Sequence, residues 1–220
     1  MRFTKMEGCG NDYIYIEDER ENIPQEEKPA LVKRLSDRHF GIGGDGVIFI
    51  RTHIEGADFG MEMYNADGSR SEMCGNGIRC VGKYVYDHAL TKKTELSVES
   101  MGKRKYLRLY AGDDGKIARV RVDMGAPELS AKRIPVNAAA SQMADDRIID
   151  ERILVLGRSY RMTCVSMGNP HAVVFVDDVK GFPVAEVGAA FETHEAFPNR
   201  VNAEFARVAD RENIEMRVFE

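Results

Sequence analysis

Short apolar runs separated by polar turns dominate this chain. The runs are rich in Val, Ile, Tyr and Phe and are bounded by Gly, Asp, Asn and Pro, a pattern typical of β-strands. They lie at Tyr13–Ile16, Val47–Ile50, Phe59–Tyr64, Leu96–Glu99, Tyr106–Tyr110, Ile117–Val122, Ile153–Leu156, Arg161–Ser166, Ala172–Val176, Val201–Val208 and Ile214–Phe219. The sequence therefore predicts a chain made mostly of strands.

Helical spacing is confined to three segments. Glu26–Arg38 carries a proline in its early turns, which fits a helix start. Gly75–Leu90 has apolar residues at intervals of three and four, and Val184–Ala190 is a shorter candidate. Strands and helices do not alternate regularly, so the pattern predicts an α+β fold. The polar, alanine-rich stretch Asn137–Asp146 is interpreted as a connection or a weak helix.

The two halves of the chain resemble each other. A Gly-Asn turn that leads into an apolar strand and then acidic residues occurs at Gly10–Asp18 and again at Gly168–Asp178. A second pair of similar strands, Met61–Asn65 and Met216–Glu220, follows at a similar spacing in each half. Such self-similarity indicates an internal duplication. We expect two domains, 1–124 and 125–220.

The repeat also leads to an expectation about the second half. In the first half Cys74 lies nine residues after Asn65, and the matching position would lie nine residues after Glu220. The chain ends on an apparent core strand at Glu220. We therefore expect the second half to be incomplete and to lack its C-terminal segment.

Composition and charge narrow the functional classes. The 31 basic and 36 acidic residues give a net charge of -5 and are mixed along the chain, so nucleic acid is not an expected partner. No apolar run reaches the roughly 18 residues of a membrane span, and the N-terminus lacks the apolar core of a signal peptide. We expect a cytoplasmic protein that acts on a small molecule.

The four cysteines are scattered and lack the paired spacing of a structural zinc site. Three of them are predicted to have packing roles: Cys9, Cys80 and Cys164. Cys74 differs, because it follows a strong turn signal and precedes the Gly-Asn-Gly that opens the second predicted helix. Backbone N–H groups and the positive end of a helix dipole stabilise a thiolate there, and they can also hold a carboxylate. Abstraction of a proton next to a carboxylate needs both a base and an anion site.

Six segments together resemble the diaminopimelate epimerase family, in its order and spacing. They are Phe3–Asp12, Arg38–Gly46, Tyr64–Ser69, Met73–Cys80, Val165–His171 and Pro198–Phe205. The resemblance implies two pseudo-symmetric halves, each a curved, mostly antiparallel sheet around a central helix, with the active site in the cleft between them. It also implies a homodimer that interconverts LL- and meso-2,6-diaminopimelate, in lysine and peptidoglycan-precursor biosynthesis, without pyridoxal phosphate, metal or any other cofactor.

The resemblance assigns roles to individual residues. Cys74 is one of two catalytic cysteines, and the other is the one that the repeat places after Glu220. His171 and Glu220 tune this cysteine pair. Substrate contacts are assigned to Asn11, Asn65, Gly75, Asn76, Asn169, Asn202 and Glu220. Many members have a substrate-binding Gln where this chain has Gly46, so that contact is not carried over.

Other functions remain open at this point. A proline-racemase-like or phenazine-pathway isomerase would share the two-half fold, but a proline-racemase site would be expected to have His in place of Asn76. Without its second cysteine, the chain could instead be a binding-only or inactive truncated form. Metal binding by Cys74, Cys80 and His88 is disfavoured by their spacing.

Overall fold

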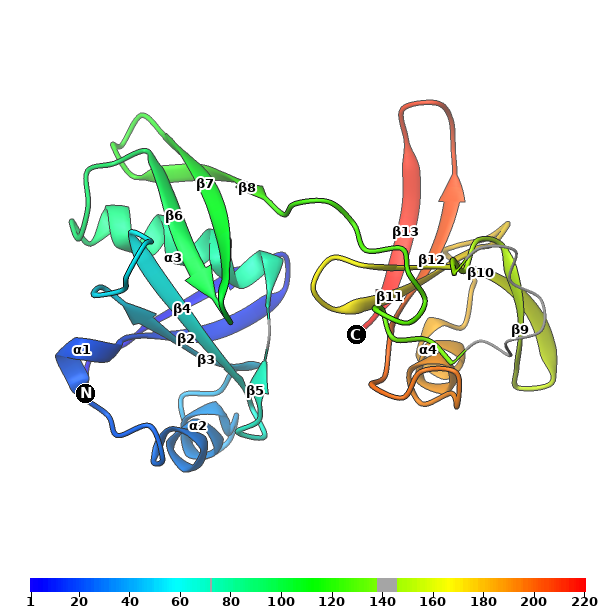
Figure 1. Cartoon of the computed structure of the whole chain (residues 1–220), viewed down its shortest axis with the longest axis horizontal. Helices are drawn as coiled ribbons and strands as arrows, with labels where there is room; N and C mark the ends of the chain where they lie inside the picture. Colours follow the sequence, from blue (N-terminus) through cyan, green and yellow to red (C-terminus); the bar gives the residue numbers. More distant parts are fainter. Residues whose placement is uncertain (72, 138–145) are drawn as a thin grey trace. The chain divides into compact units, whose positions relative to one another are not determined.

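The computed structural model describes residues 1–71, 73–137 and 146–220. The chain forms two compact units, unit 1 (Met1–Gly125) and unit 2 (Ala126–Glu220), which are coloured blue to green and green to red in Figure 1. Asn137–Asp146, interpreted above as a connection or a weak helix, lies almost entirely outside the described residues.

Unit 1 is built on one eight-stranded sheet with the order β1-β2-β3-β4-β6-β7-β8, and β5 pairs with β4. Only the β2–β3 and β4–β6 pairs are parallel. The strands are β1 (Thr4–Gly8), β2 (Asn11–Glu17), β3 (Gly46–Arg51), β4 (Phe59–Asn65), β5 (Arg70–Ser71), β6 (Glu95–Ser100), β7 (Lys103–Ala111) and β8 (Ile117–Asp123). The helices are α1 (Asp18–Glu21), α2 (Lys28–Ser36) and α3 (Gly75–Asp87).

The sheet of unit 1 curls around α3, as Figure 1 shows. This helix contacts β1 and β2 near one edge of the sheet and β7 and β8 at the other. Its apolar stripe, which includes Ile78, Val81 and Val85, is fully buried. The helical spacing in the sequence therefore correctly identified the face on which the sheet packs.

Strands β2, β3 and β4 are covered on both faces. Tyr15, Ile48 and Met63 pack with α3 in one apolar cluster, whereas the alternate residues Ile14 and Phe49 pack with α2 in another. Strands buried on both faces are expected to be continuous apolar runs without alternation. The runs Tyr13–Ile16 and Val47–Ile50 have this pattern in the sequence.

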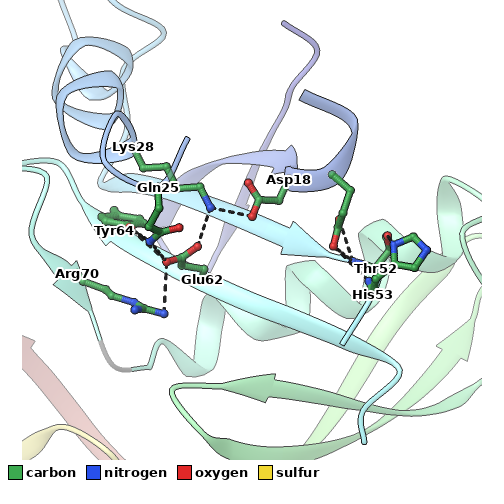
Figure 2. A network of polar contacts seen from close by, with 9 residues as sticks. Asp18, Gln25, Lys28, Thr52, His53, Glu62, Tyr64 and Arg70 are labelled. Atoms are coloured by element: carbon green, nitrogen blue, oxygen red, sulfur yellow. Dashed lines mark hydrogen bonds and ion pairs between the residues drawn. The ribbon is translucent and has the colours of Figure 1, made fainter. Parts of the chain in front are cut away.

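A buried ion pair joins α2 to β4, as Figure 2 shows. Lys28 is 2% exposed, and its Nζ lies 2.8 Å from Glu62 Oε2 and 2.7 Å from Asp18 Oδ2. Glu62 is 5% exposed and also accepts hydrogen bonds from Gln25 and Tyr64. Burial raises the pKa of Glu62, but the hydrogen bonds from Lys28 and Gln25 outweigh it and hold the pKa below its usual value.

Unit 2 has a five-stranded sheet with the order β13-β12-β11-β10-β9. The strands are β9 (Glu151–Val155), β10 (Arg158–Ser166), β11 (Pro170–Phe175), β12 (Asn202–Val208) and β13 (Ile214–Phe219). Helix α4 (Val184–Glu192) covers one face, where its Phe191 is fully buried in a cluster with Phe205. All eleven strands and three helices predicted from the sequence are present, with small changes at their ends.

The topology confirms the internal repeat and the predicted fold class. The series β1, β2, α2, β3, β4 in unit 1 has the same order and strand directions as β10, β11, α4, β12, β13 in unit 2. In both, the second and third strands are parallel and their neighbours are antiparallel. Tyr13 pairs with Gly46 in unit 1, and His171 pairs with Asn202 in unit 2. Helix α4 therefore corresponds to α2.

The second face of the unit 2 sheet differs from its counterpart. Met216 and Val218 of β13 correspond to Met61 and Met63 of β4, which are 3% and 4% exposed beneath α3. Met216 and Val218 are 57% and 46% exposed. The described part of unit 2 contains no counterpart of α3 on this face.

Replacing Lys28 by Met should lower the free energy of unfolding of unit 1 by about 3 kcal/mol, because Glu62 and Asp18 would lose their buried cation. Urea unfolding followed by circular dichroism would measure the loss. The matched control Lys93→Met removes an ion pair with Asp58 from a side chain that is 65% exposed, and should cost less than about 1 kcal/mol. Equal losses in the two variants would contradict the importance of burial.

Acid should remove the stabilisation that ionised Glu62 provides. Its pKa is lowered by folding, so its contribution is present above the unfolded value of about 4.3 and is lost as pH falls through the lower folded value. The difference in stability between the protein and a Glu62→Gln variant should therefore be constant near neutral pH and shrink in strong acid. Unfolding curves measured between these limits would test this; a pH-independent difference would argue against an ionised Glu62.

Candidate active site

Cys74 lies at the start of α3, as the sequence predicts. Its backbone is extended, with φ −127° and ψ 111°, and it forms the N-cap of the helix. The Cys74 Sγ accepts a hydrogen bond from the N–H of Gly77 at 3.2 Å. The side chain is half-buried. The N–H group and the helix dipole both stabilise negative charge on this sulfur.

The first turn of α3 offers further donors. The N–H of Gly77 donates to the Sγ of Cys74, and the N–H of Ile78 donates to the carbonyl oxygen of Cys74. The N–H groups of Gly75 and Asn76 have no acceptor among the described residues. A Cβ added to Gly75 would make ordinary van der Waals contact with the side chain of Met124, at 3.6 Å. These two N–H groups can therefore bind a carboxylate.

The β1–β2 hairpin brings Asn11 to this helix start. Its two-residue turn, Cys9-Gly10, has φ values of +52° and +95°, as a type I′ turn requires. The side chain of Asn76 donates through Nδ2 to Asn11 Oδ1 at 2.7 Å. A Cβ on Gly8 would lie 3.2 Å from the carbonyl oxygen of Asn76. The close approach of hairpin and helix therefore depends on glycine at position 8.

A charged cluster fixes the other side of the hairpin. The guanidinium of Arg38 binds both carboxylate oxygens of Asp12, at 2.7 and 3.1 Å, and also Asp45 at 2.8 Å. The Asp12 N–H donates to the Asp45 carboxylate at 3.0 Å, and the Asp45 N–H donates to the Asp12 carbonyl at 2.7 Å. The hydrogen bond from Arg38 holds the pKa of Asp12 well below its usual range. Asn11, next to Asp12, is thereby held in position.

Asn65 ends β4 at the same end of the sheet. It pairs with Gly46, and its side-chain Nδ2 donates to Ser69 Oγ at 3.1 Å. A Cβ on Gly46 would fall 1.9 Å from the carbonyl oxygen of Tyr64, so this backbone leaves no room for a side chain there. Unit 1 thus brings Asn11 to the helix start that carries Cys74 and Asn76, and places Asn65 two strands away from Asn11, at the same end of the sheet.

Unit 2 brings together a second set of predicted site residues. His171 Nδ1 lies 2.6 Å from Glu204 Oε1, and His171 Nε2 lies 3.0 Å from Asn169 Oδ1. Asn202, at the start of β12, pairs with His171 across the two parallel strands. Glu220 is exposed and directly follows β13. Four of the predicted residues therefore belong to one end of the unit 2 sheet.

Sequence reasoning did not identify Glu204 or Arg79 as site residues. Glu204 is buried, and its second oxygen, Oε2, has no hydrogen-bond partner among the described residues. Its contact with His171 arises from the register of β11 and β12, which the sequence does not reveal. Arg79 contacts Asn76, three residues earlier on α3. Helical spacing could have identified that pair.

The other three cysteines have different environments. Cys80 and Cys164 are buried, as predicted, and burial raises the pKa of both thiols, that of Cys164 to about 12. The predicted packing role of Cys9 is wrong, because this residue is exposed. It occupies the first position of a tight turn with positive φ, which lies outside the packed core.

Within residues 1–71, 73–137 and 146–220, no three His, Cys, Asp or Glu side chains cluster in a way that could hold a metal ion. None of the helices in the same ranges has the length and apolar character needed to cross a membrane.

Solved structures with the same fold define its class. A PhzF-family phenazine biosynthesis protein from Bacillus anthracis aligns over 99% of this chain and 70% of its own, with a TM-score of 0.61 and 16% identity. A hydroxyproline epimerase from Agrobacterium vitis, solved with trans-4-hydroxy-L-proline, aligns over 99% and 70%, with a TM-score of 0.58 and 13% identity. The fold is therefore the two-half α+β fold that this epimerase shares.

Sequence relatives identify the family within that class. The family model for diaminopimelate epimerase matches residues 3–130 and 163–220. The diaminopimelate epimerases of Agathobacter rectalis and Leptospira biflexa are 56% and 48% identical to this chain, and each match covers 100% of the chain and 76% of the relative. The chain belongs to the diaminopimelate epimerase family, whose members are isomerases.

Alkylation should distinguish the four thiols. Iodoacetamide at about pH 8 should label Cys9 and Cys74 in the folded protein, because both side chains are accessible. Cys80 and Cys164 should react only after unfolding in guanidinium, since both are buried and have raised pKa values. Peptide mass spectrometry would measure each site, with the unfolded protein as the control. Labelling of Cys164 before unfolding would contradict the structure.

Proposed function

We propose that the protein is a cofactor-independent epimerase that interconverts LL- and meso-2,6-diaminopimelate by proton transfer between two cysteines. One observation carries this proposal: the sulfur of Cys74 accepts a backbone N–H at the start of α3, beside the N–H groups of Gly75 and Asn76, which have no acceptor among the described residues. A base and an anion site thus lie within one helical turn. The names of the relatives support diaminopimelate as the substrate.

In the proposed reaction, the thiolate of Cys74 removes the α-proton and becomes a thiol. The electron pair left on the α-carbon is delocalised onto the adjacent carboxylate, where negative charge accumulates. The N–H groups of Gly75 and Asn76 bind that carboxylate and stabilise the added charge more strongly than the charge of the ground state. The α-proton is a very weak acid, so this stabilisation is as necessary as the base.

Inversion requires a second group on the opposite face of the α-carbon. In the proposal a cysteine thiol gives its proton to that face and becomes the thiolate, so that the pair is restored by the reverse reaction. The proposal places this second cysteine at the counterpart of Cys74 in the internal repeat. Cys80 and Cys164 are unsuited to the role because both are buried within their apolar clusters.

The proposal gives the remaining predicted residues binding and tuning roles. Asn11 and Asn65 of unit 1 and Asn169 and Asn202 of unit 2 supply amide groups, which can bind either carboxylate or ammonium groups. Their positions at the ends of strands support this role. His171, which contacts Glu204, and Glu220 supply groups that influence the charge on the cysteines.

The reaction has a defined place in metabolism under this proposal. Interconversion of the two diaminopimelate isomers supplies the meso form for lysine and for peptidoglycan precursors. Its substrate is a small dicarboxylic diamino acid, so the proposal requires no nucleic acid or membrane partner. A homodimer in the cytoplasm remains our expectation from the family resemblance.

Proton exchange with solvent tests the proposal. In deuterium oxide, the protein should replace the α-proton of diaminopimelate by deuterium, and a Cys74→Ser variant should lose at least about 100-fold in rate, because the general base is removed. Proton NMR of separate LL and meso samples would measure both exchange and inversion. A Cys9→Ser variant is the matched control, since Cys9 has no part in the proposed transfer.

Three outcomes have distinct meanings. Exchange of either isomer that depends on Cys74 supports the proposed role of this thiolate. Binding of diaminopimelate with no exchange on either isomer would favour the binding-only alternative and overturn the proposal. Full exchange in the Cys74→Ser variant would show that another group is the base.

A further inference from the structure

Arg79 is linked to Asn11 through the side chain of Asn76. Its Nη2 donates to Asn76 Oδ1 at 2.5 Å, and Asn76 Nδ2 donates to Asn11 Oδ1 at 2.7 Å. The same guanidinium nitrogen lies 3.2 Å from Cys9 Sγ. Arg79, Asn76 and Asn11 therefore form a directed chain of hydrogen bonds that ends beside the N-terminus of α3.

The direction of this chain follows from the chemistry of its first member. A guanidinium is a donor only, so Asn76 must turn its oxygen toward Arg79. The amide NH₂ of Asn76 then faces Asn11. Because this NH₂ is a donor, Asn11 must accept the hydrogen bond with its side-chain oxygen. Consequently the NH₂ of Asn11 is the part of that side chain left for another partner. No acceptor among the described residues takes it.

The backbone of α3 and the β1–β2 hairpin hold Arg79, Asn76 and Asn11 in this arrangement. Arg79 follows Asn76 by three residues on α3, so both lie on the same side of the helix. Asn11 is fixed by its hairpin and by the Asp12 carboxylate bound to Arg38. Arg79 is half-buried, which limits competition from water for the contact with Asn76.

We infer that Arg79 is a positioning residue: acting through Asn76, it orients the amide of Asn11 so that Nδ2 is presented to a ligand carboxylate. This inference rests on the proposed function. With Arg79 removed, both amides can rotate, and Asn11 can turn its oxygen toward the ligand. Two oxygens that both carry negative charge repel each other, so ligands bearing a carboxylate should bind less well.

Calorimetric titration with meso-diaminopimelate tests the inference. Arg79→Met should weaken binding about tenfold, the effect expected for one hydrogen bond to a charged group. The affinity of Arg79→Lys should lie between those of the unchanged protein and Arg79→Met, since a lysine can still donate to Asn76. Two controls should bind like the unchanged protein: Arg108→Met, which removes an exposed ion pair with Glu95, and Cys9→Ser, which leaves the Arg79 contact with Asn76 intact.

A double-mutant cycle separates positioning from a general structural effect. If Arg79 acts through Asn11, then Arg79→Met should change affinity less than twofold in an Asn11→Ala background, because the amide it orients is absent. A tenfold loss in both backgrounds would overturn the inference. A similar loss in the Arg108→Met control would also overturn it.

One measurement is independent of diaminopimelate. The side-chain NH₂ signals of Asn76 and Asn11 in ¹⁵N NMR should shift in Arg79→Met and stay in place in Arg108→Met. Unchanged signals would overturn the inference. If the signals shift but the unchanged protein does not bind diaminopimelate, the proposed function fails while the orienting role of Arg79 stands.

Discussion

The candidate site in unit 1 depends on the close approach of one helix start to one hairpin. Gly77 allows α3 to pack against Ile48 of β3, where an added Cβ would lie 2.7 Å from the isoleucine side chain. Gly8 allows the hairpin to reach the same turn of the helix. These two contacts position the N-terminus of α3, where the N–H groups of Gly75 and Asn76 have no acceptor among the described residues. A side chain at either position would have to displace a neighbour: the end of Ile48 for Gly77, and the Asn76 carbonyl or the Cys80 sulfur for Gly8.

The two units share one arrangement of strands but carry different side chains at equivalent positions. Equivalent positions carry Tyr13 and His171 on one strand, and Gly46 and Asn202 on the next. In unit 1 this arrangement supports the helix start that holds Cys74, whereas in unit 2 it supports the contact between His171 and Glu204. The shared register preserves the positions at the strand ends while the side chains there differ.

The sequence was informative where a local pattern determines the structure. Strands β2 and β3 carry runs that are apolar on both faces, and the turn before α3 is marked by glycine and asparagine, so these elements and the location of Cys74 could be predicted. Contacts between distant segments could not. The pairing of His171 with Glu204 depends on strand register, and the exposure of Cys9 depends on a tight turn that the sequence does not distinguish from a packed one.

The uncovered face of unit 2 has a consequence for handling the protein. Strand β13 is the last strand of its sheet, and Ile214, Met216 and Val218 are exposed along it. An outer strand with a row of apolar side chains is a template for pairing with another molecule. This chain should accordingly aggregate at high concentration. Substituting lysine or glutamate at these three positions should reduce that aggregation.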